Sequence, residues 1–173
     1  MPKQELYLIL NNIRSAYNIG SIFRTADGVG ISKIYLCGIS PTPEVNDNPS
    51  SLRSSGSSSK LSKTALGAEK TVPWEYHKQA LRLIKKLKNQ NSNLKIIGLE
   101  QTNKSMNVFK FKPQFPLALI VGNEVHGLNK KILSYADKII EIPMYGKKES
   151  LNVAVATGIA LYKLLEKQNA SRD

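Results

Sequence analysis

Five short apolar runs set the main constraint on the fold of this 173-residue chain. They are residues 5–10, 33–37, 94–99, 117–121 and 137–142. Each has the length and the polar flanks of a buried β-strand. Segments with helical spacing lie between or after them, at 18–29, 74–91 and 151–167. Strands that alternate with helices predict an α/β domain with a mostly parallel sheet flanked by helices.

One segment differs in kind from the rest. Residues 40–63 are rich in Ser, Pro and Asn and poor in apolar residues, which predicts a long mobile loop. Loops of this length inside compact domains are commonly functional or disordered. Arg53, Lys60 and Lys63 make it a candidate clamp for a polyanion, with an idle insertion as the alternative. No repeat or second domain is recognisable, so we expect one domain over 1–173.

The charge of the chain points to a polyanionic partner. Lys and Arg number 25 against 13 for Asp and Glu, which gives a formal net charge of +12. A surplus of this size in one small domain favours nucleic acid, although it also promotes solubility. An anionic membrane is disfavoured, because no lipidation motif or membrane-surface helix is recognisable.

The cysteine count and the N-terminal sequence predict a cytoplasmic location. Cys37 is the single cysteine and cannot form an internal disulfide, and the sequence shows no metal-ligand cluster. The first five residues are not followed by the apolar region of a signal peptide. No apolar run approaches the ~20 residues that span a bilayer. We therefore expect neither a metal centre nor membrane contact.

Three segments fall beyond strand ends, where parallel α/β sheets bind ligands. The first is N-I-G-S-I-F-R, from Asn18 to Arg24. If Asn18 caps its helix, Arg24 can extend back towards the same mouth. A guanidinium in such apolar surroundings commonly has a dedicated anionic partner, which here is a ligand, Asp27 or a helix C-terminus.

The second segment, 121–128, reads V-G-N-E-V-H-G-L. Gly122 and Gly127 allow close backbone approach or positive φ angles, and Glu124 stands between them. We interpret His126 as a turn residue. Neither a G-x-G-x-x-G fingerprint nor a P-loop is present, which argues against an ordinary nicotinamide or ATP site.

The third segment, 142–156, reads I-P-M-Y-G-K-K-E-S-L-N-V-A-V-A. Pro143 ends a strand, Gly146 turns the chain, and Ser150 is the expected N-cap of a helix rich in small residues. On its own, this segment predicts only a capped and tightly packed helix.

Together, the three segments resemble the three motifs of the SPOUT superfamily, in particular its SpoU/TrmH branch of RNA 2′-O-ribose methyltransferases. The matches are N-x-G-x-x-x-R, V-G-N-E-x-x-G-L and I-P-M-x-G-x-x-x-S-L-N-V-A-V-A, in the family's order and separation. The resemblance implies a C-terminal deep trefoil knot over about 117–165, which is a rare topology. It also implies that this knot forms a pocket for S-adenosylmethionine.

The resemblance assigns expected roles to individual residues. The cofactor would be surrounded by Leu99, Gly122, Ile142, Met144 and Leu151. The catalytic positions would be Arg24, Asn18, Glu124, Ser150 and Asn152. Candidate contacts to RNA phosphates are Arg14, Lys147 and Lys148.

The implied reaction is attack of a ribose 2′-hydroxyl on the cofactor's methyl group. The sulfonium is a good leaving group, so the enzyme must mainly align the reactants and handle the hydroxyl proton. The family proposal makes Arg24 the proton acceptor. Arginine is normally always protonated, so phosphate binding and stabilisation of charge on the 2′-oxygen form the alternative role.

The resemblance also implies a homodimer, and tRNA is slightly favoured over rRNA as substrate. We expect no separate N-terminal RNA-binding domain. The main alternative is a catalytically inactive RNA-binding module of the same fold, against which the joint presence of the five catalytic positions argues. Methylation of a base and an α/β oxidoreductase or nucleotide hydrolase are the further alternatives.

Overall fold

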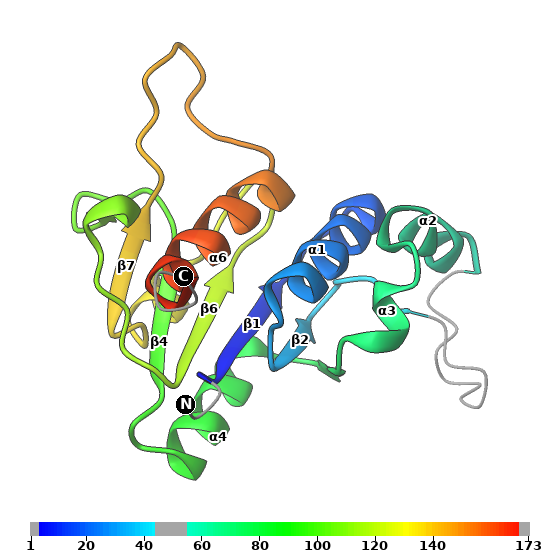
Figure 1. Cartoon of the computed structure of the whole chain (residues 1–173), viewed down its shortest axis with the longest axis horizontal. Helices are drawn as coiled ribbons and strands as arrows, with labels where there is room; N and C mark the ends of the chain where they lie inside the picture. Colours follow the sequence, from blue (N-terminus) through cyan, green and yellow to red (C-terminus); the bar gives the residue numbers. More distant parts are fainter. Residues whose placement is uncertain (1–3, 44–54, 170–173) are drawn as a thin grey trace.

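A seven-stranded parallel sheet organises the computed structural model, which describes residues 4–43 and 55–169 (Figure 1). The strands are β1 (Leu6–Asn11), β2 (Lys33–Cys37), β3 (Trp74–His77), β4 (Lys95–Leu99), β5 (Met106–Asn107), β6 (Leu117–Val121) and β7 (Lys138–Glu141). Their order is β3-β2-β1-β6-β4-β7-β5, and every pairing is parallel. The predicted α/β class is confirmed, and all strands end at one edge of the sheet.

Helices cover both faces of this sheet. They are α1 (Ala16–Val29), α2 (Ser55–Ala65), α3 (Ala68–Thr71), α4 (Ala80–Gln90), α5 (Lys130–Leu133) and α6 (Val153–Asn169), with a 3-10 turn at Val108–Lys110. Helices α1 and α6 lie side by side on one face (Figure 1). Leu8 and Leu10 point to that face, whereas Ile9 points to the face covered by α4. This alternation explains why the strands read as unbroken apolar runs.

The helix predicted over 74–91 is wrong in its first part. Residues Trp74–His77 form edge strand β3, which pairs in parallel with β2, and the helix begins only at Ala80. Aromatic residues favour strands, and Tyr35 of β2 contacts the ring of His77 edge-on. The added strand places the first turn of α4 at the edge of the sheet where the strands end.

The loop predicted over 40–63 is corrected where the structure describes it. Residues 44–54 lie outside the described residues, but 55–63 belong to α2. Leu61 and Ala65 are buried against α1 at Gly20. A Cβ at Gly20 would overlap the Leu61 carbonyl and the Thr64 side chain. The glycine of the first motif therefore permits close packing of two helices.

Two helix caps differ from the prediction. Ser15, not Asn18, caps α1, and its Oγ accepts a hydrogen bond from the Asn18 backbone N–H at 3.2 Å. Asn152, not Ser150, caps α6, and its Oδ1 accepts from the Ala154 N–H at 2.9 Å. With these caps, the side chains of Asn18 and Asn152 are hydrogen-bonded to each other.

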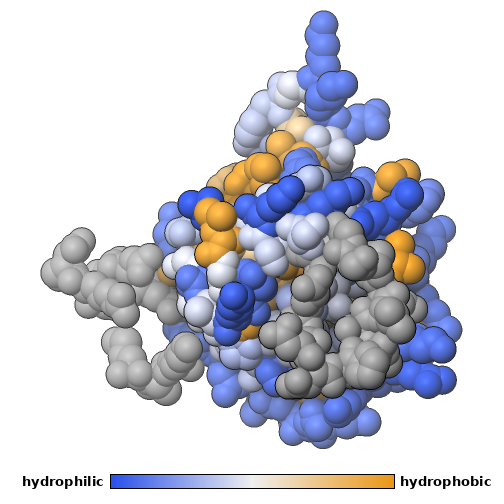
Figure 2. Space-filling model, turned by 90° about the vertical axis from the view of Figure 1, so that its right-hand side faces the viewer, coloured by the Kyte–Doolittle hydropathy of each residue, from blue (hydrophilic) through white to orange (hydrophobic). Residues whose placement is uncertain are grey.

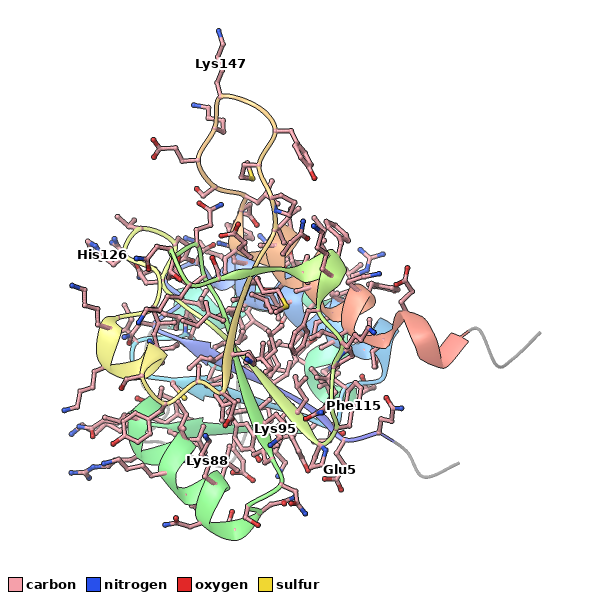
Figure 3. The ribbon with its side chains drawn as sticks, turned by 90° about the vertical axis from the view of Figure 1, so that its left-hand side faces the viewer. Glu5, Lys88, Lys95, Phe115, His126 and Lys147 are labelled. Carbon is pink, nitrogen blue, oxygen red and sulfur yellow. The ribbon has the colours of Figure 1, made fainter. Side chains whose placement is uncertain are left out.

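The segment between β7 and α6 protrudes from the edge where the strands end (Figure 1). Lys147 lies at its tip and points away from the body, whereas Glu5 and Lys95 lie at the opposite end (Figure 3). The protrusion is hydrophilic at its tip, with apolar residues at its base (Figure 2). Among the helices within 4–43 and 55–169, none is both long and apolar enough to cross a membrane.

Candidate active site

A cavity of about 260 Å³ opens beyond the ends of β4, β6 and β7. All five residues predicted to surround a cofactor line it, namely Leu99, Gly122, Ile142, Met144 and Leu151. Three of the predicted catalytic residues also line it, namely Glu124, Ser150 and Asn152. Residues that are distant in the sequence thus meet at one place.

Two glycines shape one wall of this cavity, which we call the first cavity. A Cβ at Gly122 would overlap the backbone of Gly127 and Leu128. Gly127 has a φ of 61°, and its N–H donates to the Asn123 carbonyl at 2.9 Å. The 122–128 segment therefore folds back on itself so tightly that there is no room for a side chain at Gly122.

A polar network joins the three sequence motifs at the mouth of the cavity. The Glu124 carboxylate accepts from the backbone N–H groups of Arg14 at 2.9 Å and Ser15 at 3.0 Å. It also accepts from Asn18 Nδ2 at 3.1 Å. Asn18 Oδ1 in turn accepts from Asn152 Nδ2 at 3.1 Å. The network fixes the start of α1 relative to the start of α6.

The same network sets the ionisation of Glu124. Partial burial acts to raise the pKa of its carboxyl, but hydrogen bonds from Arg14, Ser15, its own backbone and Asn18 outweigh burial and lower the pKa below its ordinary value. Glu124 is therefore ionised at neutral pH, with its oxygens engaged by donors.

Arg24 lies apart from this network. It is exposed on α1 and is not among the residues that line the first cavity. Within the described ranges its guanidinium has no ion-pair partner, and Asp27 instead accepts a hydrogen bond from Thr71 Oγ1 at 2.8 Å. Asp27 is thus not the partner of Arg24, and the guanidinium is open to an external anion.

The predicted RNA contacts are exposed. Arg14 gives its backbone N–H to Glu124 and leaves its side chain in solvent. Lys147 and Lys148 lie on the protruding segment, with Lys147 at its tip (Figure 3). None of the three lines the first cavity.

Two acidic residues of the cavity were missed by the sequence analysis. Glu100 directly follows β4 and accepts from the Leu128 N–H at 2.7 Å. Glu141 ends β7 and accepts from Ser105 Oγ at 2.5 Å. Both positions stand at strand ends, a rule that the sequence analysis applied only to its motifs.

The lining of the first cavity is acidic although the chain as a whole is basic. Glu100, Glu124 and Glu141 line it, and no described Lys or Arg does. The formal net charge of the whole chain is nevertheless +12. Such a cavity suits a ligand with positive charge. The described part of the chain holds no group of three or more His, Cys, Asp or Glu side chains that suits a metal ion.

Residues 5–162 match the family model described as the SpoU rRNA Methylase family. The chain belongs to this family. It is 30% identical over 163 residues to the tRNA (guanosine(18)-2'-O)-methyltransferase of Aquifex aeolicus, covering 93% of this chain and 69% of that protein. It is 31% identical over 168 residues to the 23S rRNA (guanosine-2'-O-)-methyltransferase RlmB of Haemophilus influenzae, covering 96% of this chain and 61% of the relative. The chain thus spans about six tenths of the length of this rRNA-modifying relative.

Solved structures of RNA-modifying enzymes share the fold. The crystal structure of the Aquifex aeolicus TrmH/SpoU tRNA modifying enzyme matches with a TM-score of 0.79 at 28% identity, covering 98% of this chain and 78% of that one. The AdoMet-bound rRNA methyltransferase of Sinorhizobium meliloti matches with a TM-score of 0.77 at 26% identity, covering 96% and 58%. S-adenosylmethionine is therefore the cofactor that these matches indicate.

Two features of the first cavity fit this cofactor. Its acidic lining suits a sulfonium, and Gly122 and Gly127 contribute backbone without side chains to the lining. The cofactor has no phosphate group, which is consistent with a cavity without lysine or arginine and with a sequence without a phosphate-binding fingerprint.

Proposed function

We propose that this protein is an S-adenosylmethionine-dependent RNA methyltransferase that methylates a ribose 2′-hydroxyl of tRNA or rRNA. One observation carries the proposal. Asn18, Glu124 and Asn152, one from each motif, are joined by hydrogen bonds at the mouth of the first cavity. The family membership and the names of the relatives support the same reaction.

The residues that line the first cavity indicate where the cofactor would bind. Leu99, Gly122, Ile142, Met144 and Leu151 would hold it, largely through main-chain groups. When bound, S-adenosylmethionine supplies a methyl group on a positively charged sulfur. Ser150 lines the same cavity, and in this proposal its hydroxyl contacts the incoming ribose.

Glu124 acts in this proposal as a positioning residue. Its carboxylate already accepts hydrogen bonds from Arg14, Ser15 and Asn18, and its lowered pKa makes it a poor proton acceptor at neutral pH. It therefore holds the start of α1, and with it Asn18, against the cofactor cavity. Asn152 completes this brace from the start of α6.

Arg24 is the catalytic residue of the proposal. It lies six positions after Asn18 on α1, which is a rise of about 9 Å along the helix axis. Its exposed guanidinium, with no partner among the described side chains, can bind the phosphate beside the target ribose and stabilise negative charge on the 2′-oxygen. Acceptance of the hydroxyl proton by Arg24 itself is the alternative role.

The proposal includes a deep trefoil knot over about 117–165 and a homodimer. The resemblance of the three motifs to the SpoU/TrmH branch, together with the family match over residues 5–162, supports the knot. Exposed apolar residues support an interface: Val155 and Tyr162 lie seven positions apart on α6 and are 51% and 58% exposed, and Tyr17 on α1 is 47% exposed. Replacement of Tyr162 by Glu should give a monomer in sedimentation experiments, and an unchanged dimer would place the interface elsewhere.

The cytoplasmic location predicted from the sequence belongs to the same proposal.

Methyl transfer tests the function directly. The protein is incubated with S-adenosylmethionine labelled in its methyl group and with separated, unmodified tRNA and rRNA fractions, while calorimetry follows cofactor binding. We expect label in one fraction. Cofactor binding without transfer to any fraction would favour the inactive RNA-binding module. Absence of cofactor binding would contradict the assignment of the first cavity.

A further inference from the structure

A second cavity of about 250 Å³ opens beyond the ends of β1 and β2, on the face covered by α4. Strand ends, the first turn of α4 and the region of α5 form its wall, with Asn11, Asn12, Gly38, Lys78, Gln79, Ala80, Leu81, Asn129, Lys131 and Ile132. It shares no lining residue with the first cavity. The family motifs, as read from the sequence, did not include any of these residues.

The second cavity is basic. Lys78 and Lys131 are exposed, and neither forms an ion pair with a residue in 4–43 or 55–169. No described Asp or Glu lines the cavity. Two exposed lysines that line the same cavity favour an anionic ligand.

Asn11 gives an independent indication of a ligand. Asn11 is only 5% exposed, and its side-chain amide has no hydrogen-bond partner in the described part of the chain. It lies two positions after Ile9, so its side chain points to the α4 face, where it lines the second cavity. Among the described residues, the amide atoms of Asn11 do not belong to the fully buried side-chain atoms without a partner, so solvent reaches them and a polar ligand in the cavity can hydrogen-bond to this amide.

The other amides of the wall present mainly donors. Asn12 Oδ1 accepts from the Ile39 N–H at 3.1 Å, and Asn129 Oδ1 accepts from the Ile132 N–H at 2.9 Å. Each leaves its NH₂ group for another partner. Gln79 is the N-cap residue of α4, and its side chain accepts no cap hydrogen bond. The N–H groups of the first turn of α4 therefore also remain available. Such a wall matches phosphate oxygens.

The two cavities are neighbours. Asn123 lines the first cavity and Asn12 lines the second. Asn123 Nδ2 donates to the Asn12 carbonyl at 2.8 Å, so one hydrogen-bonded pair separates them. Both open at the edge where the parallel strands end. A nucleic-acid strand with one ribose over the first cavity therefore has further nucleotides within reach of the second.

We propose that the second cavity binds a phosphate-bearing nucleotide of the substrate RNA strand, close to the nucleotide that is methylated. The phosphate lies on Lys78 and Lys131, and Asn11 contacts a polar group of the same nucleotide. This site rests on the proposed RNA methyltransferase function, because it assigns a place to the flanking RNA.

The test compares two double variants with the same loss of charge. Lys78→Ala/Lys131→Ala removes the cations of the second cavity. Lys86→Ala/Lys138→Ala removes two exposed lysines, from the C-terminal half of α4 and from the start of β7. RNA binding is measured by fluorescence anisotropy with an unmodified tRNA transcript and an rRNA fragment over a range of salt. Calorimetry with S-adenosylmethionine checks that the first cavity is intact in both.

We expect the Lys78/Lys131 variant to bind at least one of the two RNAs about tenfold or more weakly, with a salt slope that is smaller by about 1.4, or about 0.7 for each lost single-strand phosphate contact. The control should keep its affinity within about twofold. Equal loss in both variants would attribute the effect to general charge and overturn the site. Unchanged binding of both RNAs by the Lys78/Lys131 variant would overturn it as well.

Two further measurements distinguish an RNA site from a site for a free anion. Asn11→Asp places a carboxylate of similar size in the cavity and should weaken RNA binding without a change in cofactor affinity; unchanged RNA binding would count against the site. Inorganic phosphate and adenosine monophosphate should bind far more weakly than RNA, and equally tight binding would assign the cavity to a free anion.

Methyl-transfer assays distinguish a failure of the second-cavity site from a failure of the proposed function. Failure of transfer in the unaltered protein, with RNA binding still lost in the Lys78/Lys131 variant, would reject the proposed function but retain the site. Normal transfer by the Lys78/Lys131 variant with an unchanged KM for RNA would reject the site alone.

Discussion

The two cavities at the edge of the sheet differ in charge although they lie side by side. Three carboxylates line the first, with no described lysine or arginine, whereas two lysines line the second, with no described Asp or Glu. The formal net charge of +12 is thus distributed unevenly over the molecule. A basic chain can attract RNA over much of its surface and still keep an acidic pocket for a cofactor with a sulfonium. Changes to one cavity should therefore leave binding at the other intact.

The largest expected effect belongs to a residue in neither cavity. Arg24→Ala should lower kcat by about 10²- to 10³-fold, because charge on the 2′-oxygen loses its stabilising partner. Affinity for S-adenosylmethionine should not change, since Arg24 does not line the first cavity. Single-turnover methyl transfer and calorimetry check the two statements. Arg82→Ala, an exposed arginine on α4, is the control. A retained rate in Arg24→Ala would remove both roles considered for this residue.

Gly122→Ala tests the backbone wall of the first cavity. The added Cβ would overlap the backbone of Gly127 and Leu128, which no side-chain rotation relieves. A cost of about 3 kcal/mol corresponds to a loss of cofactor affinity of about 100-fold. Gly146→Ala, where a Cβ meets no atom within 4 Å, should bind normally. Calorimetry on both variants decides, and equal affinities would show that the wall is not needed for the cofactor.

Glu124→Gln tests the brace between the motifs. The glutamine NH₂ cannot accept a hydrogen bond, so a backbone N–H of Arg14 or Ser15 loses its acceptor, at a cost of about 1–3 kcal/mol in unfolding free energy. The pKa of Glu124 is lowered on folding, so its stabilising contribution is present at neutral pH and is lost as pH falls through the folded-state pKa.

Urea denaturation at several pH values measures this difference. The difference in unfolding free energy between the unaltered protein and Glu124→Gln should be present at neutral pH and should disappear in acid. Glu149→Gln, on the exposed protruding segment, should stay within about 0.5 kcal/mol of the unaltered protein at each pH. A gap that does not depend on pH would mean that the carboxylate charge does not contribute.

The smallest expected effect concerns ligand charge. Glu141→Gln should weaken S-adenosylmethionine binding by about threefold to tenfold, because one carboxylate no longer attracts the sulfonium across a partly solvated cavity. S-adenosylhomocysteine lacks that charge, so its affinity should hardly change. Calorimetry with both ligands gives the ratio. Equal weakening of the two would indicate a steric effect of the substitution instead of an electrostatic one.

The sequence predicted the parts of this molecule whose signals are local or shared with a family. Strands β2 and β6 have the predicted bounds. The five residues expected to hold the cofactor line one cavity, and their contact with the cofactor stays a prediction. Prediction failed for β3, because the four residues Trp74–His77 precede a strongly amphipathic helix and were read as its first turn. It failed for the described part of α2 because serine-rich composition masks a helix whose burial depends on contact with Gly20.

Features that depend on tertiary contacts were beyond the sequence. The caps at Ser15 and Asn152 depend on where each helix begins in space, and the capping interpretation of Asn18 hid its bond to Glu124. Glu100 belongs to no motif identified in the sequence, and its role appears only when β4 lies beside β6. Asn11 lies just after the predicted strand 5–10, and only the fold brings its amide to a cavity that two lysines also line.

The position of the transferred methyl group tests the central claim most directly. RNA methylated by this protein is digested to nucleosides, and mass spectrometry locates the methyl group, with a second RNA in which the target nucleotide lacks its 2′-hydroxyl. We predict a 2′-O-methylated nucleoside from the first RNA and no transfer to the second. A methyl group on a base, or undiminished transfer to the 2′-deoxy substrate, would contradict the account.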